Sequence, residues 1–344
     1  MMETVHIALP SDENYVIGLT VTAGSIAYHA SRDVKLMMHI LDGGIKDDTF
    51  AQMAEKIHKL HPHVEFHRIA VDETLFKNYP VWSGNKMTYA RLLLAEALPD
   101  VSHIIYSDTD FLWLIDIAEL WQQRSDDVIF MSTLDFPTTI ASEEKWAKSH
   151  NLPFDRNNYF CAGLSFYNLN KFRQEKIIDQ VSEFLCTHPD VILADQSALN
   201  HVLINRVQLL PQLWQTYSIT LTPENILQPI AIHYAGDIPW NRAKSLTLPI
   251  SDSTLLWYAM LDYINGVESG SSIKQDLSRW QRIYKYSLNF IYTHSLSMAL
   301  FSIFLKAIGR GKYSSSFKRL SSKLNLSRSE IQQRILVKGE TGKL

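Results

Sequence analysis

The sequence predicts an α/β fold with a mostly parallel sheet that helices cover on both faces. Short apolar runs alternate with longer amphipathic stretches from residue 5 to about residue 203. This alternation is the pattern of strand–helix–strand units, whose strands are buried on both sides. Neither a G-x-G-x-x-G segment nor a P-loop pattern occurs, so the usual dinucleotide and P-loop sites have no support.

The first half of the chain contains four of the expected strands. The strand at 5–9 is broken by the polar stretch 10–14, and the next helix carries Ile17, Val21 and Ile26 on its apolar side. The following elements are expected in this order: strand 36–41, helix 46–60, strand 64–69, helix 87–98 before Pro99, and strand 104–106.

The second half continues the alternation less regularly. The expected elements are strand 128–132, strand 163–169, helix 171–185, helix 195–203 and a short strand at 229–232. The polar stretch 134–159 is predicted to be a long irregular loop. A loop of that length usually serves as a lid or a binding wall.

Composition places the chain among ordinary globular proteins. Its 344 residues are 46% hydrophobic and 20% charged, enough for one large domain plus an appendage or for two modest domains. The two cysteines, Cys161 and Cys186, form no disulfide framework and fit a reducing compartment. Because no basic start precedes an apolar core at the N-terminus, we expect a cytoplasmic protein without a secretory signal.

Charge divides the chain into an acidic body and a basic tail. Residues 1–270 contain 19 Lys and Arg against 33 Asp and Glu, whereas residues 271–344 contain 14 against 3. We therefore predict a main domain at 1–270 and a basic, aromatic-rich helical tail at 271–344. Its apolar run at 288–308 is too interrupted to span a bilayer.

Interleaved basic and aromatic residues fit helices that lie on an anionic membrane surface. The tail thus predicts a protein peripheral to the inner face of a membrane. The alternative is a helical packing domain with a solvated basic face. Nucleic acid is not expected as a partner, because the acidic body would repel it.

The polar insert 107–110 between two apolar runs is the central candidate site. Residues two apart in an extended chain face the same side, so Asp108 and Asp110 would present both carboxylates in one direction. A divalent cation would relieve their repulsion, and oxygen ligands suit Mg²⁺ or Mn²⁺. The alternative is a turn, or an N-terminal cap for a helix that starts near Asp116.

Two segments farther along the chain carry small or polar residues that suit a binding site. The small residues of segment 157–163 would let backbone approach a ligand closely, or they form an ordinary strand entry. Asp195 and Gln196 could bind sugar hydroxyls, since together they offer donors and acceptors. Alternatively, Asp195 caps the helix that starts there.

His233 and Arg91 complete the set of candidate residues. His233 follows the short strand 229–232, and an imidazole beside two aspartates would be a third ligand that favours Mn²⁺. Nearby Gly236 could free backbone N–H groups for phosphate. Arg91 could reach anionic groups of a ligand, although a surface charge is the alternative.

In this order, the segments resemble glycosyltransferase family 8 over roughly residues 3–245. The matching segments are Ser11-Asp12-Glu13-Asn14-Tyr15, Thr88-Tyr89-Ala90-Arg91-Leu92, Asp108-Thr109-Asp110, Tyr159-Phe160-Cys161-Ala162-Gly163, Asp195-Gln196 with Leu199-Asn200, and His233-Tyr234 with Gly236 and Pro239-Trp240. Each is weak alone, and six in order are specific. The resemblance implies a single nucleotide-sugar-binding, Rossmann-like domain of the A type, as in bacterial lipooligosaccharide α-galactosyltransferases.

The resemblance also implies roles for individual residues. Asp108, Asp110 and His233 would hold Mn²⁺ or Mg²⁺. The catalytic residues that hold the donor sugar would be Arg91, Asp195 and Gln196. The remaining contacts to a UDP-sugar would come from Asp12, Asn14, the backbone of Ala8 and Leu9, Thr109, Cys161, Ala162, Gly163 and Gly236.

Three positions depart from the family pattern. Cys161 stands where the family usually has Asn, and Ser197 stands where an Asp often follows Asp195-Gln196. The segment at His233 is one residue shorter, and Ile238 replaces the Lys that clamps the phosphates. Arg242 and Lys244 are the candidate substitutes for that Lys. These departures bear on the identity of the donor sugar and on activity.

The implied function is a metal-dependent retaining hexosyltransferase. It would move galactose or glucose from a UDP-hexose to a glycan or lipid-linked saccharide acceptor, in the synthesis of lipopolysaccharide or another surface polysaccharide. Gln196 is a neutral amide and a poor nucleophile, so we expect attack from the face that the phosphate leaves. The alternative, supported by Cys161 and Ile238, is a catalytically inactive protein that binds nucleotide sugars or glycans.

Overall fold

The computed structural model describes residues 2–81, 86–222, 225–226, 228–244, 251–268 and 270–276. The chain divides into two compact units, Met1–Gln215 and Thr216–Leu344, which are taken separately below. The predictions for the basic tail concern residues that, from 277 onward, lie outside the described ranges.

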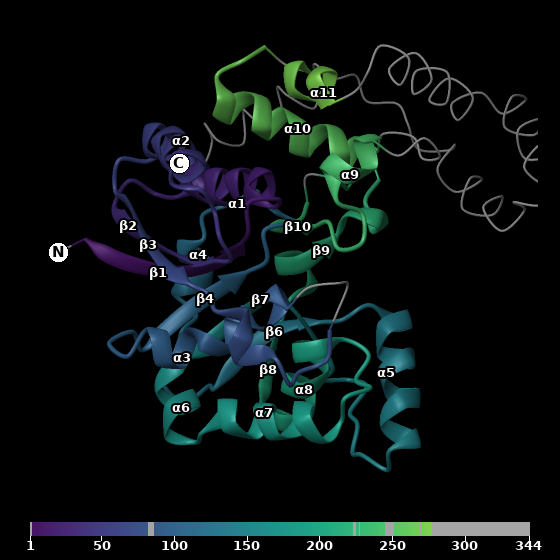
Figure 1. Ribbon diagram of the computed structural model, residues 1–344. Coiled ribbons are helices and arrows are strands. Elements are labelled where there is room, and N and C mark those ends of the chain that lie inside the picture. Colours follow the sequence, from purple (N-terminus) through teal and green to yellow (C-terminus); the bar gives the residue numbers. More distant parts are fainter. Residues whose placement is uncertain are drawn as a thin grey trace, which may run out of the picture. The chain divides into compact units, whose positions relative to one another are not determined.

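The first unit is built on a seven-stranded sheet with the order β3-β2-β1-β4-β7-β6-β8 (Figure 1). Its strands are β1 (Glu3–Ser11), β2 (Val34–Asp42), β3 (Val64–Ala70), β4 (His103–Ser107), β6 (Phe130–Leu134), β7 (Phe160–Asn168) and β8 (Val207–Leu210). All neighbouring pairs are parallel except those of β7, which runs antiparallel to both β4 and β6. The predicted mostly parallel α/β fold is confirmed.

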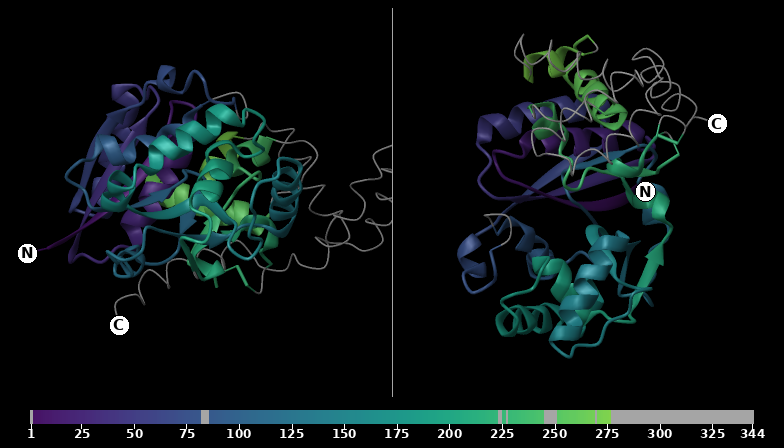
Figure 2. Two further views of the ribbon diagram at one scale, coloured as in Figure 1. Left: turned by 90° about the horizontal axis from the view of Figure 1, so that it is seen from below. Right: turned by 90° about the vertical axis from the view of Figure 1, so that its right-hand side faces the viewer.

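Helices cover both faces of this sheet (Figures 1 and 2). On one face lie α1 (Val16–His29) and α2 (Asp47–Leu60). On the other lie η2 (Met87–Leu93), α3 (Leu94–Ala97), α6 (Leu169–Gln174), α7 (Ile177–Thr187) and α8 (Ala194–Val202). The central strands read as nearly continuous apolar runs because both of their faces are buried: Ile7 and Ala8 of β1 face opposite sides, and each is fully buried.

One expected loop is a helix. The stretch 134–159 contains α5 (Pro137–Ser149), so the prediction of a long irregular loop was wrong. Pro137 occupies the first turn, where its missing N–H costs nothing. Ile140, Glu143 and Trp146 are buried at helical spacing, but the polar residues between them hid this period in the sequence.

Two other expected helices are divided. The predicted helix at 87–98 begins as the 3₁₀ helix η2 and becomes α-helical only in α3. The predicted helix at 171–185 is two helices, because Lys176 adopts a left-handed backbone conformation (φ 52°) between α6 and α7. Such a residue interrupts the helical hydrogen-bond ladder.

The second unit is smaller in its described part. Its strands β9 (Thr216–Tyr217) and β10 (Ala231–His233) are parallel neighbours, and α9 (Pro239–Lys244), α10 (Asp252–Asn265) and α11 (Ser271–Asp276) follow. Asp262 of α10 accepts backbone hydrogen bonds from Gly270 and Ser272, which fixes the start of α11. Among the described residues, no helix is both long enough and apolar enough to cross a bilayer.

Three histidines form a hydrogen-bonded row across β1, β2 and β3. Nδ1 of His6 lies 3.0 Å from Nε2 of His39, and Nδ1 of His39 lies 3.2 Å from Nδ1 of His67. Burial, and then the neighbouring imidazoles, lower the pKa of His39 to about 3. His39 therefore stays neutral in the folded protein between pH 6.5 and about 3, a range in which the unfolded chain would carry a proton on it.

This row of histidines predicts that the folded protein loses stability at acidic pH. Because the folded-state pKa of His39 lies below its unfolded value of 6.5, its contribution to stability is complete above pH 6.5 and falls as the pH drops toward 3. We expect His39 to cost about 2 kcal/mol of unfolding free energy between pH 7 and pH 5. Urea titrations at both pH values should show this loss in the wild type and a smaller one in His39→Met. The same loss in both proteins would contradict the assignment.

Candidate active site

The two aspartates of the Asp-x-Asp segment lie in a turn at the carboxyl end of β4. Asp108, Thr109 and Asp110 connect β4 to β5 (Phe111–Trp113), so they are not part of an extended strand as the spacing argument assumed. Asp108 is held there by its backbone N–H, which donates to Gly163 O at 2.8 Å. Its carboxylate and that of Asp110 are half-buried, and Thr109 is buried.

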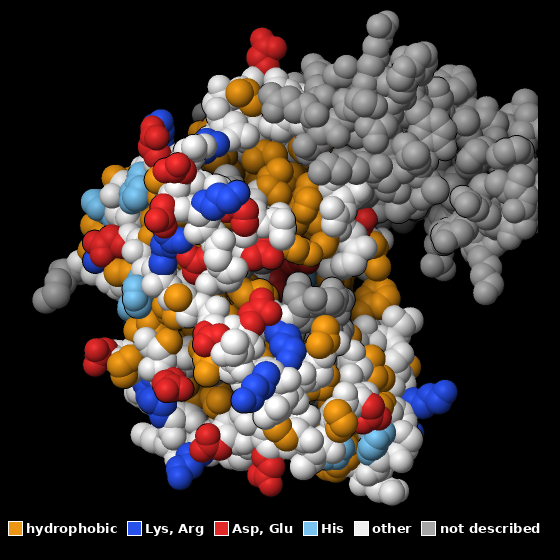
Figure 3. Space-filling model, in the orientation of Figure 1, with side chains coloured by type: hydrophobic (Ala, Val, Ile, Leu, Met, Phe, Trp, Pro, Cys, Tyr) orange, Lys and Arg blue, Asp and Glu red, His pale blue; other side chains and the backbone are white. Residues whose placement is uncertain are grey.

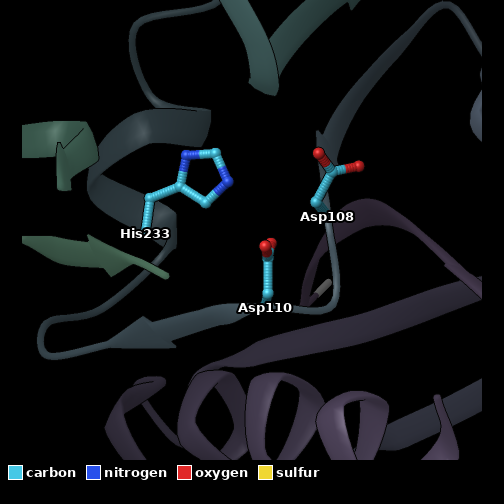
Figure 4. Close-up of side chains that lie close together, drawn as sticks. All are labelled: Asp108, Asp110 and His233. Carbon is cyan, nitrogen blue, oxygen red and sulfur yellow. The ribbon is translucent and has the colours of Figure 1, made fainter. Parts of the chain in front are cut away.

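The first unit contributes two of the predicted metal ligands. Asp108 and Asp110 each offer a carboxylate oxygen, and these two atoms lie within 4.8 Å of one another (Figure 4). Paired carboxylates suit a hard cation such as Mn²⁺ or Mg²⁺ better than a softer metal. The two residues therefore fit a divalent cation, and His233, which belongs to the second unit, stays a predicted third ligand.

Tyr106 and Arg91 fix the orientation of the Asp108 carboxylate. The Tyr106 hydroxyl donates to Oδ1 at 2.7 Å, and Nη2 of Arg91 donates to the same oxygen at 2.9 Å. Both of these bonds fall on the same oxygen of the carboxylate. Groups that hold a metal ligand in this way determine its direction and its basicity.

Arg91 is buried and forms ion pairs with two carboxylates. Its side chain is only 4% exposed, and it pairs with Asp108 and, through Nε at 2.9 Å, with Asp195. Its guanidinium also donates to the backbone oxygen of Ala162 and lies 4.2 Å from the Tyr106 ring centre. Burial opposes its charge, but the two carboxylates hold the pKa of Arg91 well above its usual value. The alternative of a surface charge was wrong.

Asp195 and Gln196 occupy the first turn of α8. The cap position belongs to Leu193, and Asp195 is buried against Arg91 and the Thr88 hydroxyl, so the alternative of Asp195 as a helix cap was wrong. Burial raises the pKa of Asp195, while Arg91 and Thr88 oppose that shift.

The Gln196 amide is held at both ends. Its oxygen accepts from Ala162 N at 3.0 Å, and its nitrogen donates to Asp135 Oδ2 at 2.6 Å. These two bonds determine which way the amide faces. The rotation of Gln196 is therefore set by the protein before any substrate binds.

The backbone of residues 161–163 in β7 anchors the three central side chains. Ala162 N and O contact Gln196 and Arg91, and Gly163 O accepts from Asp108 N. The backbone of these small residues thus forms hydrogen bonds with other residues of the protein itself. Cys161 is buried with a free thiol, and its backbone oxygen accepts from Ser132 at 2.6 Å.

The remaining candidates occupy the ends of β1 and β10. Ala8 and Leu9 are fully buried in β1, and Asp12 accepts from the backbone N–H groups of Asn14 and Tyr15, which turns the chain into α1. In the second unit, the imidazole of His233 stacks on Tyr217 at 5.5 Å, Gly236 has a left-handed φ of 69°, and Ile238 is half-buried. The side chains of Arg242 and Lys244 lie outside the described ones.

Sequence reasoning missed Asp135, Tyr106 and the role of Thr88. Asp135 directly follows β6, so the rule that polar residues after strands mark a site would have found it. Tyr106 read as an apolar strand residue, and only the fold shows that its hydroxyl reaches Asp108.

The orientation of Asp108 can be tested by removing one hydroxyl. Tyr106→Phe deletes the bond to Oδ1, so we expect the affinity for Mn²⁺ to fall about tenfold, as when other groups that support a metal ligand are removed. Calorimetric titration with MnCl₂ measures this affinity. Tyr167→Phe is the matched control, because that buried hydroxyl makes no hydrogen bond among the described residues. Equal affinities in both variants would contradict the role of Tyr106.

The chain is similar to known proteins over most of its length. The chain is 28% identical over 266 residues to General stress protein A of Bacillus subtilis, covering 70% of this chain and 88% of the relative. A structure of galactosyltransferase LgtC with donor and acceptor sugar analogues superposes with a TM-score of 0.62 at 22% identity, covering 79% of this chain and all of that one.

The bifunctional glycosyltransferase WbbM superposes with a TM-score of 0.64 at 20% identity, covering 80% of this chain and about half, 52%, of that protein. At these identities the two structures establish the fold, that of glycosyltransferases of the A type. The profile of glycosyl transferase family 8 matches residues 6–244. The chain belongs to glycosyl transferase family 8.

Proposed function

We propose that this protein transfers a hexose, galactose or glucose, from a UDP-sugar to a glycan acceptor with retention at the anomeric carbon and with Mn²⁺ or Mg²⁺ as cofactor. The observation that carries the proposal is the pair of carboxylates at Asp108 and Asp110, next to the Asp195–Gln196 turn that Arg91 joins to Asp108. LgtC is a galactosyltransferase, which supports a hexose as the transferred sugar.

The charges around Arg91 support a cation at this place. One guanidinium faces the carboxylates of Asp108 and Asp195, and Asp110 adds a third carboxylate close to Asp108. Such an excess of negative charge is costly in a partly buried site. A bound divalent cation would offset it, and would stabilise the charge on a departing diphosphate as a Lewis acid.

The side chains would then have separate roles in the reaction. Asp108 and Asp110 bind the cation, and His233 completes the set. Gln196 keeps its amide toward the sugar because Asp135 and Ala162 N hold it. As a neutral group it stabilises a developing positive charge rather than forming a bond. The acceptor hydroxyl loses its proton to the leaving phosphate on the same face.

A thermal-shift panel tests the proposal. UDP-galactose, UDP-glucose, UDP and a control nucleotide such as GDP are compared with and without MnCl₂, since only ligands of the folded state raise Tm. We expect a rise with a UDP ligand only when Mn²⁺ is present, and slow release of UDP from one of the two sugars. Asp110→Asn should abolish both effects.

The outcomes of the panel are distinct. A Mn²⁺-dependent shift without UDP release would favour the inactive binding protein over the enzyme. An Asp110→Asn protein that still hydrolyses the sugar nucleotide in a Mn²⁺-dependent way would overturn the metal assignment. No shift with any uridine ligand would overturn the donor assignment.

We further propose that the basic tail, 271–344, attaches the enzyme to an anionic membrane surface, where a lipid-linked saccharide of surface polysaccharide synthesis would be the acceptor. The support is its excess of basic residues, 14 against 3 acidic ones. By contrast, acidic and basic side chains are interspersed on the face of the described residues in Figure 3. The attraction should weaken with salt.

Vesicle sedimentation tests the tail. Replacement of Arg279, Arg282, Lys285, Arg310 and Lys312 by Gln in the full-length protein should abolish binding to phosphatidylglycerol vesicles. The wild type should bind them in low salt, and should not bind phosphatidylcholine vesicles. Undiminished binding by the variant would refute the role of the tail.

A further inference from the structure

Glu143 is a buried carboxyl group that the proposed mechanism does not use. It lies on α5, and its side chain has no exposure to solvent. Oε1 accepts a hydrogen bond from the Ser197 hydroxyl at 2.9 Å, while Oε2 has no hydrogen-bond partner among the described residues. A buried ionised carboxylate with one unpaired oxygen is costly, so these surroundings favour the neutral acid.

Ser197 connects this carboxyl group to the start of α8. The same hydroxyl that donates to Glu143 accepts from the backbone N–H of Leu193 at 2.9 Å. Between them, Ala194 adopts a left-handed φ of 49°, a strained conformation for a residue with a Cβ. Asp195 and Gln196 follow immediately. The hydrogen bonds from Leu193 to Ser197 and from Ser197 to Glu143 thus close the strained turn that presents both residues.

The charged and titratable groups that act on Glu143 are few. Asp135, which follows β6, is an acid, and Tyr159, which precedes β7, is a buried phenol. From α8 the neighbours are the neutral side chains of Ser197 and Gln196. Burial, with a smaller contribution from Asp135, raises the pKa of Glu143 to about 7, while the hydroxyls of Ser197 and Tyr159 oppose this shift.

We infer that Glu143 is a positioning residue for sugar transfer, which holds the Asp195–Gln196 turn through Ser197 and which, when it ionises, disturbs the Gln196 amide through repulsion of Asp135. The inference rests on the proposed function. Ionisation would place a second negative charge beside Asp135, the residue that holds the Gln196 amide. α5 thus supplies a carboxyl group to the first turn of α8.

The pH profile of turnover tests this inference. UDP-galactose and UDP-glucose hydrolysis with MnCl₂ is measured from pH 5.5 to 8.5 for the wild type, Glu143→Gln and Glu144→Gln. We expect kcat of the wild type to decline as the pH rises through about 7. In Glu143→Gln, a neutral amide of the same shape, the pH at half-maximal kcat should rise by at least one unit.

Glu144→Gln is the matched control for the same chemical change one residue away. Glu144 pairs with Lys148 and Arg156 at the surface and does not face α8. Its variant should keep the wild-type pH profile. A Glu143→Gln profile that coincides with that of the wild type would overturn the inference while leaving the proposed function intact. Absence of turnover in the wild type with both sugars would instead overturn the proposed function.

A double-mutant cycle tests whether Glu143 acts on the Asp195–Gln196 turn through Ser197. Ser197→Ala breaks the link, and misplacement of Gln196 should lower kcat about tenfold or more with little change in KM. In Glu143→Ala the loss should be similar. The double variant Glu143→Ala with Ser197→Ala should be no worse than either single one. Multiplied losses would show that the two side chains act independently, and would overturn the route.

Measurements of thermal stability can detect the ionisation of Glu143 without any substrate. Its folded-state pKa lies above the unfolded value of 4.5, so the folded protein binds more protons and loses stability as the pH rises from about 4.5 to 7. The difference in Tm between Glu143→Gln and the wild type should therefore increase from pH 5 to pH 8. The contribution of His39 cancels in this difference. A difference that stays constant with pH would overturn the titration.

Discussion

The buried ion pairs of Arg91 are the interaction on which the site depends. One guanidinium, 4% exposed, joins Asp108 at the end of β4, Asp195 at the start of α8 and the backbone of Ala162 in β7. Removing such a charge from water is expensive, and the cost is recovered only where the geometry satisfies its hydrogen bonds. The fold maintains this arrangement because three separate elements contribute to it.

The site contains more negative than positive charge. Arg91 offsets part of the negative charge of Asp108 and Asp195, and Asp110 adds more beside Asp108. A fully neutralised cluster would have no affinity for a cation, whereas an excess of carboxylate stores an unfavourable energy that a divalent ion relieves. Tyr106 then sets the direction of the carboxylate. The proposed cation would therefore stabilise this arrangement of the site.

A second polar network supports the Gln196 turn from the other side. Asp135 and Ala162 N fix the amide of Gln196, and Ser197 and Glu143 fix the backbone that precedes it. Most of these groups are buried, so the network has few alternative arrangements and holds the turn rigidly. The strained backbone at Ala194 persists only because the surrounding bonds determine it.

The sequence alone determined the strand and helix alternation, the parallel sheet and the family, because hydrophobic period and short motifs are local properties of the chain. It also placed Asp108, Asp110, His233, Asp195 and Gln196 among the candidates. It failed where polar residues mask a period, as in α5, and where a side chain has two plausible uses, as with Arg91 and Asp195. Only the tertiary structure decided that Arg91 is buried between two acids and that Glu143 reaches Ser197 from 54 residues away. Those contacts join residues that are distant in the chain, and no local pattern specifies which of them will meet.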